Sequence, residues 1–481
     1  MGEAGMTTHH STVTKVGRPV LTAMVIGSMV GGGVFSLPGG FATTTGVAGA
    51  LIAWTLAGTG MLMLALCFQN LALRRPELDA GVFIYAKAGF GDYVGFNSAI
   101  GYWASGVAGN AFYWVFITAT IGAFLPGFGS GGTLLAVAVS TVGVWVFHFL
   151  IARGVRDAAV VNRIVTICKL VPILVFVVVL ATQFDPEVFR ANFLARDELG
   201  SLTDQVRNTM IITTFVFIGV EGASVYSRHA QRREDVGTAT VLGFLSVLAL
   251  FALVTMVSYG AFDRSRIAQT REPSMVGLFE GVVGPWGEWF VSAGVVVSVL
   301  GAYLAWTLMA AEVMHAPARA EDMPAALGRE NDHGTPIGAL LATTVGAQVL
   351  LGLTLLISDS LNFMLALSTC MVLVPYLLAA AYALKLAVTG ETYEHDARHR
   401  RRHAVIAVLA VAYAIFLFVA AGPPFLLLSC LVYAPAALLY VRARTERGRR
   451  IFTRAELVLF LIICVGAIAG VYTLSTGGID V

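Results

Sequence analysis

Residues 27–38 read GSMVGGGVFSLP, and they lie inside the first long apolar run of the chain. A helix needs about 20 mostly apolar residues to cross the hydrocarbon core of a membrane. Gly31, Gly32 and Gly33 are poor residues for the interior of such a helix, each costing about 1 kcal/mol relative to alanine. Small residues can also serve close helix packing. A run of three favours a broken helix instead, whose free backbone N–H groups face a cavity.

A second interruption lies at residues 217–224, which read FIGVEGAS. Glu221 stands between Gly219 and Gly222 in the middle of another apolar run. A carboxylate at that depth costs about 2.5–3.5 kcal/mol on insertion scales, which makes it a functional candidate by default. The alternative is a structural carboxyl that accepts hydrogen bonds from free backbone N–H groups.

The rest of the chain is apolar in the same way. It is 57% hydrophobic and 12% charged, whereas a soluble domain carries about 25% charged residues. The runs are too long for barrel strands, so helices are the remaining way to satisfy the backbone in lipid. We therefore predict an all-α membrane protein with about thirteen transmembrane helices, at residues 18–43, 48–70, 98–125, 133–151, 162–182, 206–227, 238–262, 284–314, 336–357, 361–388, 404–421, 424–441 and 455–475.

Orientation follows from the basic residues of the connections, because cytoplasmic loops are rich in Lys and Arg. With the N-terminus inside, all but six of the 31 Lys and Arg lie on the inner side or in the bilayer, and the exceptions are Arg190, Arg196, Arg207, Arg264, Arg266 and Arg271. The predicted domains are a cytoplasmic tail (1–17), a ten-helix core (18–388), a basic cytoplasmic loop (389–403) and three further helices (404–475). The prediction is an integral protein of the bacterial inner membrane.

The two interruptions are five spans apart. Interrupted segments at corresponding positions of two halves mark the midplane site of an inverted-repeat transporter. Residues 18–182 and 206–388 would be the two repeats, with broken helices 1 and 6 facing each other. The half-helix that starts after Gly33 would point N–H groups at a carboxylate. The half-helix that ends near Ile218 would offer carbonyls to an ammonium group, so that together they recognise an amino acid.

Several stretches now point to a known family. The chain resembles the amino acid–polyamine–organocation superfamily, in its basic amino acid/polyamine antiporter group, and is similar to bacterial arginine/ornithine antiporters. The resembling stretches are 25–38, 75–79, 85–93, 217–224 and 372–376. The resemblance implies a LeuT-like fold of five plus five inverted repeats.

The resemblance also implies roles for single residues. Gly31, Gly32 and Gly33 would bind the substrate carboxylate and Ile218 its amino group. The side-chain pocket would hold Tyr102, Asn110, Trp306 and Ser368, and the gating or coupling residues would be Phe215, Glu221, Tyr376 and Lys169. Phe215 stands where the family often has tryptophan, so the ring is kept and the indole N–H is lost. From the residues alone, Trp306 could be plain packing and Asn110 an interhelical hydrogen bond.

Lys169 is the other charge inside an apolar run. It could reach the nearby membrane surface with its long side chain. The resemblance implies that it takes the place of a sodium ion, either as a permanent brace or as a titrating group, and argues against sodium dependence.

We expect the protein to exchange cationic amino acids by alternating access, importing arginine and exporting ornithine, with lysine as a further substrate. The alternatives are a proton-coupled lysine or arginine permease, an arginine/agmatine-type exchanger and an amino-acid sensor with a transporter fold. The sequence has no Walker loop and no nucleophile–base pair, so we expect no enzyme, no catalytic residue, no cofactor and no metal. The expected partners are membrane lipid and a second copy in a homodimer, and not nucleic acid.

Overall fold

The computed structural model describes residues 17–78, 82–154, 158–221, 231–394 and 396–476, and within these ranges its regular structure is entirely helical. Of the predicted N-terminal tail only Gly17 lies among them. Gly222, Ala223 and Ser224, at the end of the second interrupted stretch, lie outside the described residues.

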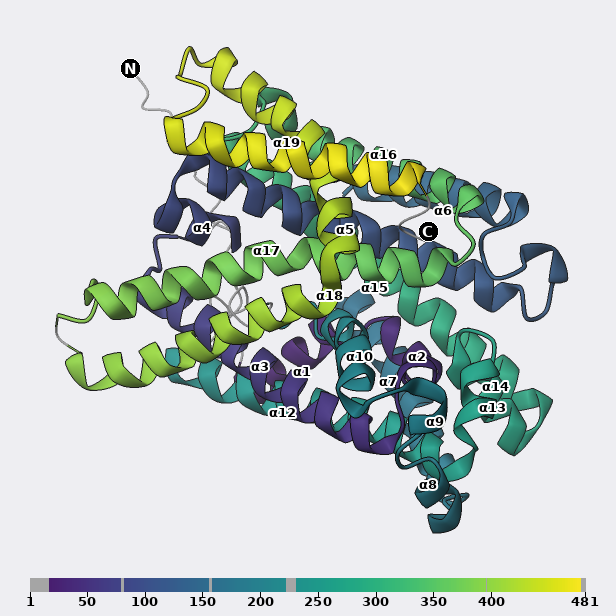
Figure 1. Cartoon of the computed structure of the whole chain (residues 1–481). Coiled ribbons are helices and arrows are strands. Elements are labelled where there is room, and N and C mark those ends of the chain that lie inside the picture. Colours follow the sequence, from purple (N-terminus) through teal and green to yellow (C-terminus); the bar gives the residue numbers. More distant parts are fainter. Residues whose placement is uncertain (1–16, 79–81, 155–157, 222–230, 395, 477–481) are drawn as a thin grey trace, which may run out of the picture.

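Figure 1 shows the longer helices, which overlap the predicted apolar runs except for those at residues 82–90 and 274–283. They are α1 (Arg18–Met29), α2 (Leu37–Thr44), α3 (Val47–Arg74), α4 (Val82–Phe90), α5 (Asp92–Ile121), α6 (Leu134–Ala152), α7 (Ala158–Ala181), α10 (Leu202–Val216), α12 (Arg233–Ala261), α14 (Ser274–Val283), α15 (Pro285–Arg319), α16 (Ile337–Leu353), α17 (Ser360–Thr389), α18 (Ala397–Glu446) and α19 (Arg454–Ser475). The short helices α8 (Pro186–Ala191) and α9 (Arg196–Leu199) lie between α7 and α10, and the short helix α13 (Arg264–Gln269) lies between α12 and α14.

Eight of the helices in the described ranges are long and apolar enough to cross a membrane, or nine if the bent pair α1 and α2 forms one span. This number is lower than the thirteen predicted runs for identifiable reasons. The described apolar part of α7, Val165–Ala181, is short, and α18 counts once although it consists of two helices that meet at a kink, where Gly422 has a non-helical φ of 79°. That kink lies between the two predicted runs 404–421 and 424–441.

Local sequence signals set several helix ends. Thr133 accepts a hydrogen bond from the Ala136 N–H at the start of α6, as N-cap hydroxyls do. Thr453 and Glu456 form a capping box at the start of α19. Gly390 ends α17 in the left-handed conformation, which glycine adopts without strain.

The centre of the bundle is built on α5, which is buried along most of its length and packs against both α15 and α17. α1 packs on α12, and α10 packs on α3. α19 lies on α18 at one side of the bundle (Figure 1) and leaves Leu461, Ile462, Val465 and Ile468 exposed. An apolar face of this kind suits lipid, since lipid needs no polar cover.

The predicted basic loop after α17 is tied to the end of α3. The Arg74 guanidinium donates to Asp396 at 2.7 Å and lies 3.6 Å above the centre of the Tyr393 ring. Hydrogen bonds from His399 and Arg74 hold the pKa of Asp396 below its usual value. This contact fixes the connection between the bundle core and α18.

Candidate functional site

The first apolar run is broken at the glycine triplet. α1 ends at Met29, and a short 3₁₀ turn from Gly33 to Ser36 leads into α2 at an angle of 55° to α1. The backbone N–H groups of Gly31 and Gly32 make no hydrogen bond to any residue that the structure describes. Unpaired N–H groups at the start of a helical turn form an anion-binding site.

The sixth run is interrupted at the predicted place. α10 ends at Val216, and residues 217–221 continue as tight turns in which the Ile218 N–H donates to the Phe215 carbonyl. Gly219 has a φ of 106°, a conformation that side chains rarely tolerate. The continuation of this run after Glu221 lies outside the described residues.

The two interruptions touch each other. The Ser28 hydroxyl donates to the Gly219 carbonyl at 3.1 Å, and a methyl group added to Gly219 would lie 2.4 Å from the Ser28 carbonyl oxygen. Two segments nearly 200 residues apart in sequence therefore form one continuous patch of irregular backbone. Such backbone is tolerated at membrane depth only where protein buries it or where it lines a cavity.

Gly219→Ala is expected to destabilise the folded protein by about 1–3 kcal/mol, because alanine would be strained at this φ and would press on Ser28. Thermal unfolding of the purified protein should occur several degrees lower, with arginine exchange reduced several-fold. Gly352→Ala is the matched control, since nothing lies within 4 Å of the added methyl group. Equal melting temperatures for the two variants would contradict the contact between the interruptions.

Lys169, on α7, occupies the end of the first half-helix. Its ammonium donates to the carbonyls of Gly27 at 2.6 Å and Val30 at 2.7 Å, and the side chain is 3% exposed. These are carbonyls that the end of α1 leaves without a helical partner. The side chain therefore points inward and binds the break, and does not reach toward the membrane surface.

Glu221 lies at the end of the second interruption and is buried. Its carboxylate accepts hydrogen bonds from the hydroxyls of Tyr102 and Tyr376, and from the Gly219 N–H at 3.2 Å. Tyr102 belongs to α5 and Tyr376 to α17, so one carboxylate joins three separate elements. Tyr376 also packs edge-on against Phe68 of α3.

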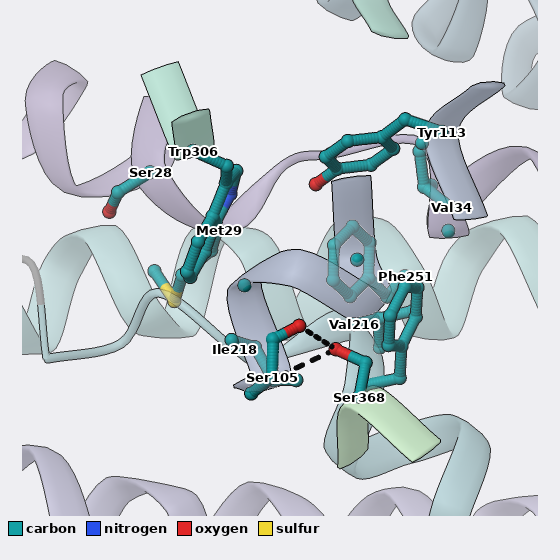
Figure 2. Close-up of a pocket in the computed structure, with 16 residues that line it drawn as sticks. Ser28, Met29, Val34, Ser105, Tyr113, Val216, Ile218, Phe251, Trp306 and Ser368 are labelled. Carbon is teal, nitrogen blue, oxygen red and sulfur yellow. Dashed lines mark hydrogen bonds between the residues drawn. The ribbon is translucent and has the colours of Figure 1, made fainter. Parts of the chain in front are cut away.

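A cavity of about 30 Å³ lies where the interruptions meet (Figure 2). Its lining residues come from both interruptions and from α5, α10, α12, α15 and α17; they are Ser28, Met29, Gly31, Gly32, Gly33, Val34, Ser105, Gly106, Gly109, Tyr113, Phe215, Val216, Ile218, Phe251, Trp306 and Ser368. None of these residues carries a charge. The volume holds one or two water molecules, so an amino acid can enter only if side chains of the wall move.

Aromatic rings bound the cavity on two sides. Phe215 is buried against Phe112, with 4.8 Å between ring centres, and packs on Gly33. Trp306 of α15 is partly exposed and lies 6.5 Å from the Tyr102 ring, centre to centre.

The hydroxyl groups of Ser105 and Ser368 lie together in the wall of the cavity. Ser368 of α17 donates to the Ser105 carbonyl at 2.9 Å, and the two hydroxyl oxygens are 3.3 Å apart (Figure 2). Asn110 lies behind this wall, where its amide donates to the Thr307 hydroxyl at 3.1 Å. Its carbonyl oxygen is buried and has no partner in the described part of the chain.

Not every predicted site residue lines the cavity. Those that do are Gly31, Gly32, Gly33, Phe215, Ile218, Trp306 and Ser368. Tyr102, Glu221 and Tyr376 form the hydrogen-bonded group beside it, and Lys169 and Asn110 lie behind its wall.

Sequence reasoning missed Ser105 and Tyr113, which also line the cavity. Both belong to α5, and a signal for them was present. Tyr102, Ser105, Gly109 and Tyr113 are separated by three or four residues, so they share a helix face. The residue types, a serine and a tyrosine in an apolar run, gave no separate indication of a site.

Comparison with known proteins shows the family of this chain. The family model described as amino acid permease matches residues 17–426. The chain is 46% identical to an arginine/ornithine antiporter of Pseudomonas aeruginosa over 95% of its own length and 96% of that protein's. It is 36% identical to an L-lysine transport protein of Corynebacterium glutamicum, over 98% and 97% of the two lengths. It is 33% identical to an arginine/agmatine antiporter of Chlamydia pneumoniae, over 99% and 100% of the two lengths.

These matches cover both interruptions and the helices that carry the cavity, and they confirm the resemblance drawn from the sequence. The chain therefore belongs to the amino acid permease family, and it is an integral membrane protein.

Proposed function

We propose that this protein exchanges arginine for ornithine across the bacterial inner membrane, by alternating access to the cavity between the two interruptions. The observation that carries the proposal is the combination of free N–H groups at Gly31 and Gly32 with an uncharged cavity that Trp306 borders. The relative at 46% identity is an arginine/ornithine antiporter, which supports the choice of substrates.

The α-carboxylate of the substrate would bind the N–H groups of the glycine triplet, since the start of a helical turn attracts anions. The α-amino group would bind carbonyls at the end of α10, near Ile218. A cationic side chain would then lie against Trp306, because an ammonium or guanidinium group is attracted to the face of an indole ring.

Glu221 would couple the binding of substrate in the cavity to movement of the second interruption. It holds Tyr102 and Tyr376 together on one side of the cavity, so a shift of the second interruption would pull on both rings. Tyr376 would act as the inner gate and Phe215 as the outer gate. Lys169 would brace the first break.

The architecture that fits this mechanism is two inverted repeats of five spans, 18–182 and 206–388, followed by three further helices in 404–475. With an odd number of spans per repeat, the two repeats have opposite orientations and their interruptions face each other. We place the N-terminus in the cytoplasm, because this orientation puts most Lys and Arg of the loops on the inner side.

Counterflow in reconstituted vesicles tests the exchange. Vesicles loaded with unlabelled arginine or ornithine should take up labelled arginine, whereas empty vesicles should not, with or without a pH gradient. Accumulation of arginine in empty vesicles under a pH gradient would instead establish a proton-coupled permease. Efficient uptake into vesicles loaded with agmatine, and not ornithine, would establish an arginine/agmatine exchanger like the Chlamydia relative.

Ser368→Ala is expected to weaken arginine binding about fivefold, since one hydrogen bond to the side-chain end of the substrate is worth about 1 kcal/mol. The half-saturating arginine concentration for counterflow measures the change. Ser246→Ala is the control, because this exposed hydroxyl donates to the Leu242 carbonyl of its own helix. An unchanged half-saturating concentration in Ser368→Ala would remove Ser368 from the side-chain pocket.

A further inference from the structure

The Tyr113 side chain lies across the glycine triplet. A methyl group added to Gly31 would lie 3.2 Å from the Tyr113 hydroxyl oxygen, and one added to Gly32 would lie 3.5 Å from two of its ring carbons. The residue is 6% exposed and lines the cavity. Figure 2 shows its hydroxyl turned away from Val34, toward the side of the cavity on which Trp306 lies.

This hydroxyl has no hydrogen-bond partner among the residues that the structure describes. Buried tyrosine hydroxyls usually have one. Tyr259 donates to the Thr45 carbonyl at 2.7 Å and Tyr376 donates to Glu221, whereas the buried hydroxyls of Tyr93, Tyr413, Tyr433 and Tyr440 also have no partner among the described residues. An unpaired buried donor costs about 1–3 kcal/mol. Unlike those four residues, Tyr113 lines the cavity, so a group that enters the cavity can become the partner of its hydroxyl.

The chemistry of the missing partner follows from its neighbours. The N–H groups of Gly31 and Gly32 also lack an acceptor within the described ranges. Donors from two elements, the first break and α5, thus border one space in which the lining residues supply no carboxylate. A ligand that satisfies all of them must carry several acceptor lone pairs on one group, as a carboxylate does.

We propose that the Tyr113 hydroxyl donates a hydrogen bond to the α-carboxylate of the substrate, and that this contact makes the site prefer amino acids over amines with the same cationic side chain. The inference rests on the proposed exchange of cationic amino acids and specifies how the carboxylate is recognised. A site built to hydrogen-bond a group rejects an analogue that lacks the group, because its buried polar atoms are then left unpaired. Agmatine and putrescine lack the carboxylate that arginine and ornithine carry.

Tyr113→Phe tests the proposal, since it removes a single oxygen and keeps the ring. The measurement is the inhibition constant of arginine, ornithine, agmatine and putrescine against labelled-arginine counterflow. Arginine and ornithine should bind at least tenfold more weakly to the variant, as expected for loss of a hydrogen bond to a charged group. Agmatine and putrescine should change less than twofold, so that the preference for amino acids falls by about a factor of ten.

Tyr93→Phe is the matched control. Tyr93 is on the same helix, and its buried hydroxyl also has no partner among the described residues. It packs near the start of α5 against Phe96 and Tyr440, away from the cavity. All four inhibition constants should stay at the wild-type values in this variant.

Two results would overturn the proposal: equal weakening of all four ligands by Tyr113→Phe, which indicates a structural role, or no change for arginine and ornithine. Both presuppose that the wild-type protein exchanges arginine. If the wild-type protein fails to do so in loaded vesicles, the proposed function itself is wrong, and that outcome is visible before any variant is made.

Discussion

Trp306→Ala is expected to raise the half-saturating concentrations of arginine and ornithine about 30-fold in counterflow measurements. A cation held against an indole ring away from water gains about 2 kcal/mol, and each 1.36 kcal/mol corresponds to a factor of ten. The lining residues that the structure describes include no carboxylate that could take over this role. Trp306→Phe keeps an aromatic ring, so the half-saturating concentrations should rise only a few-fold.

The control for this variant is Trp289→Ala on the same helix. Trp289 is 63% exposed and stacks on Phe124, 4.0 Å between ring centres, outside the cavity. Its removal should leave both half-saturating concentrations unchanged. If Trp306→Ala also behaved as the wild type, the cationic side chain would have to bind elsewhere, and the assignment of the pocket would be wrong.

Lys169→Met is expected to abolish exchange and to lower the thermal stability of the purified protein. Methionine has a similar length but no charge, so the carbonyls of Gly27 and Val30 would lose their donor inside the protein. Hydrogen bonds from a charged group are each worth about 1.5–3 kcal/mol, and a buried unpaired acceptor adds a further penalty. The break in the first span would then lack the group that holds its carbonyl end.

A variant at a second lysine, Lys385, distinguishes loss of stability from loss of function. Lys385 donates to the Gly89 carbonyl at 2.7 Å, away from both interruptions, so Lys385→Met loses the same type of bond elsewhere. The Lys385→Met protein should unfold at a lower temperature than the wild type and keep the wild-type exchange rate per folded molecule. A Lys169→Met protein that exchanged arginine at the wild-type rate would show that the brace is dispensable.

The elements that could be predicted are those whose signal is local. Runs of apolar residues located the helices, and the three glycines located the break in the first span, because few other structures tolerate such a triplet. Glu221 could be identified as a functional candidate because a carboxylate in an apolar run is costly and is rarely present without a function. The family membership followed from the same short stretches.

What could not be predicted depends on how separate helices approach each other. Glu221 joins Tyr102 to Tyr376, and Lys169 binds two carbonyls at the end of α1. These contacts link residues that are 119 to 155 positions apart in the sequence. Asn110, predicted for the side-chain pocket, donates to Thr307 of α15, and the residues alone had left open whether it serves the pocket or an interhelical hydrogen bond. Ser105 and Tyr113 were missed since polar residues on a buried helix face serve packing as often as binding.

The uncharged wall of the cavity has a consequence for energetics. Arginine and ornithine each carry a net charge of about +1 near neutral pH, and the lining adds none. One-for-one exchange of these two then moves no net charge, so the membrane voltage neither drives nor opposes it. Agmatine carries one more positive charge than arginine, and its export in return for arginine would work against about 2.3 kcal/mol for every 100 mV of inside-negative potential.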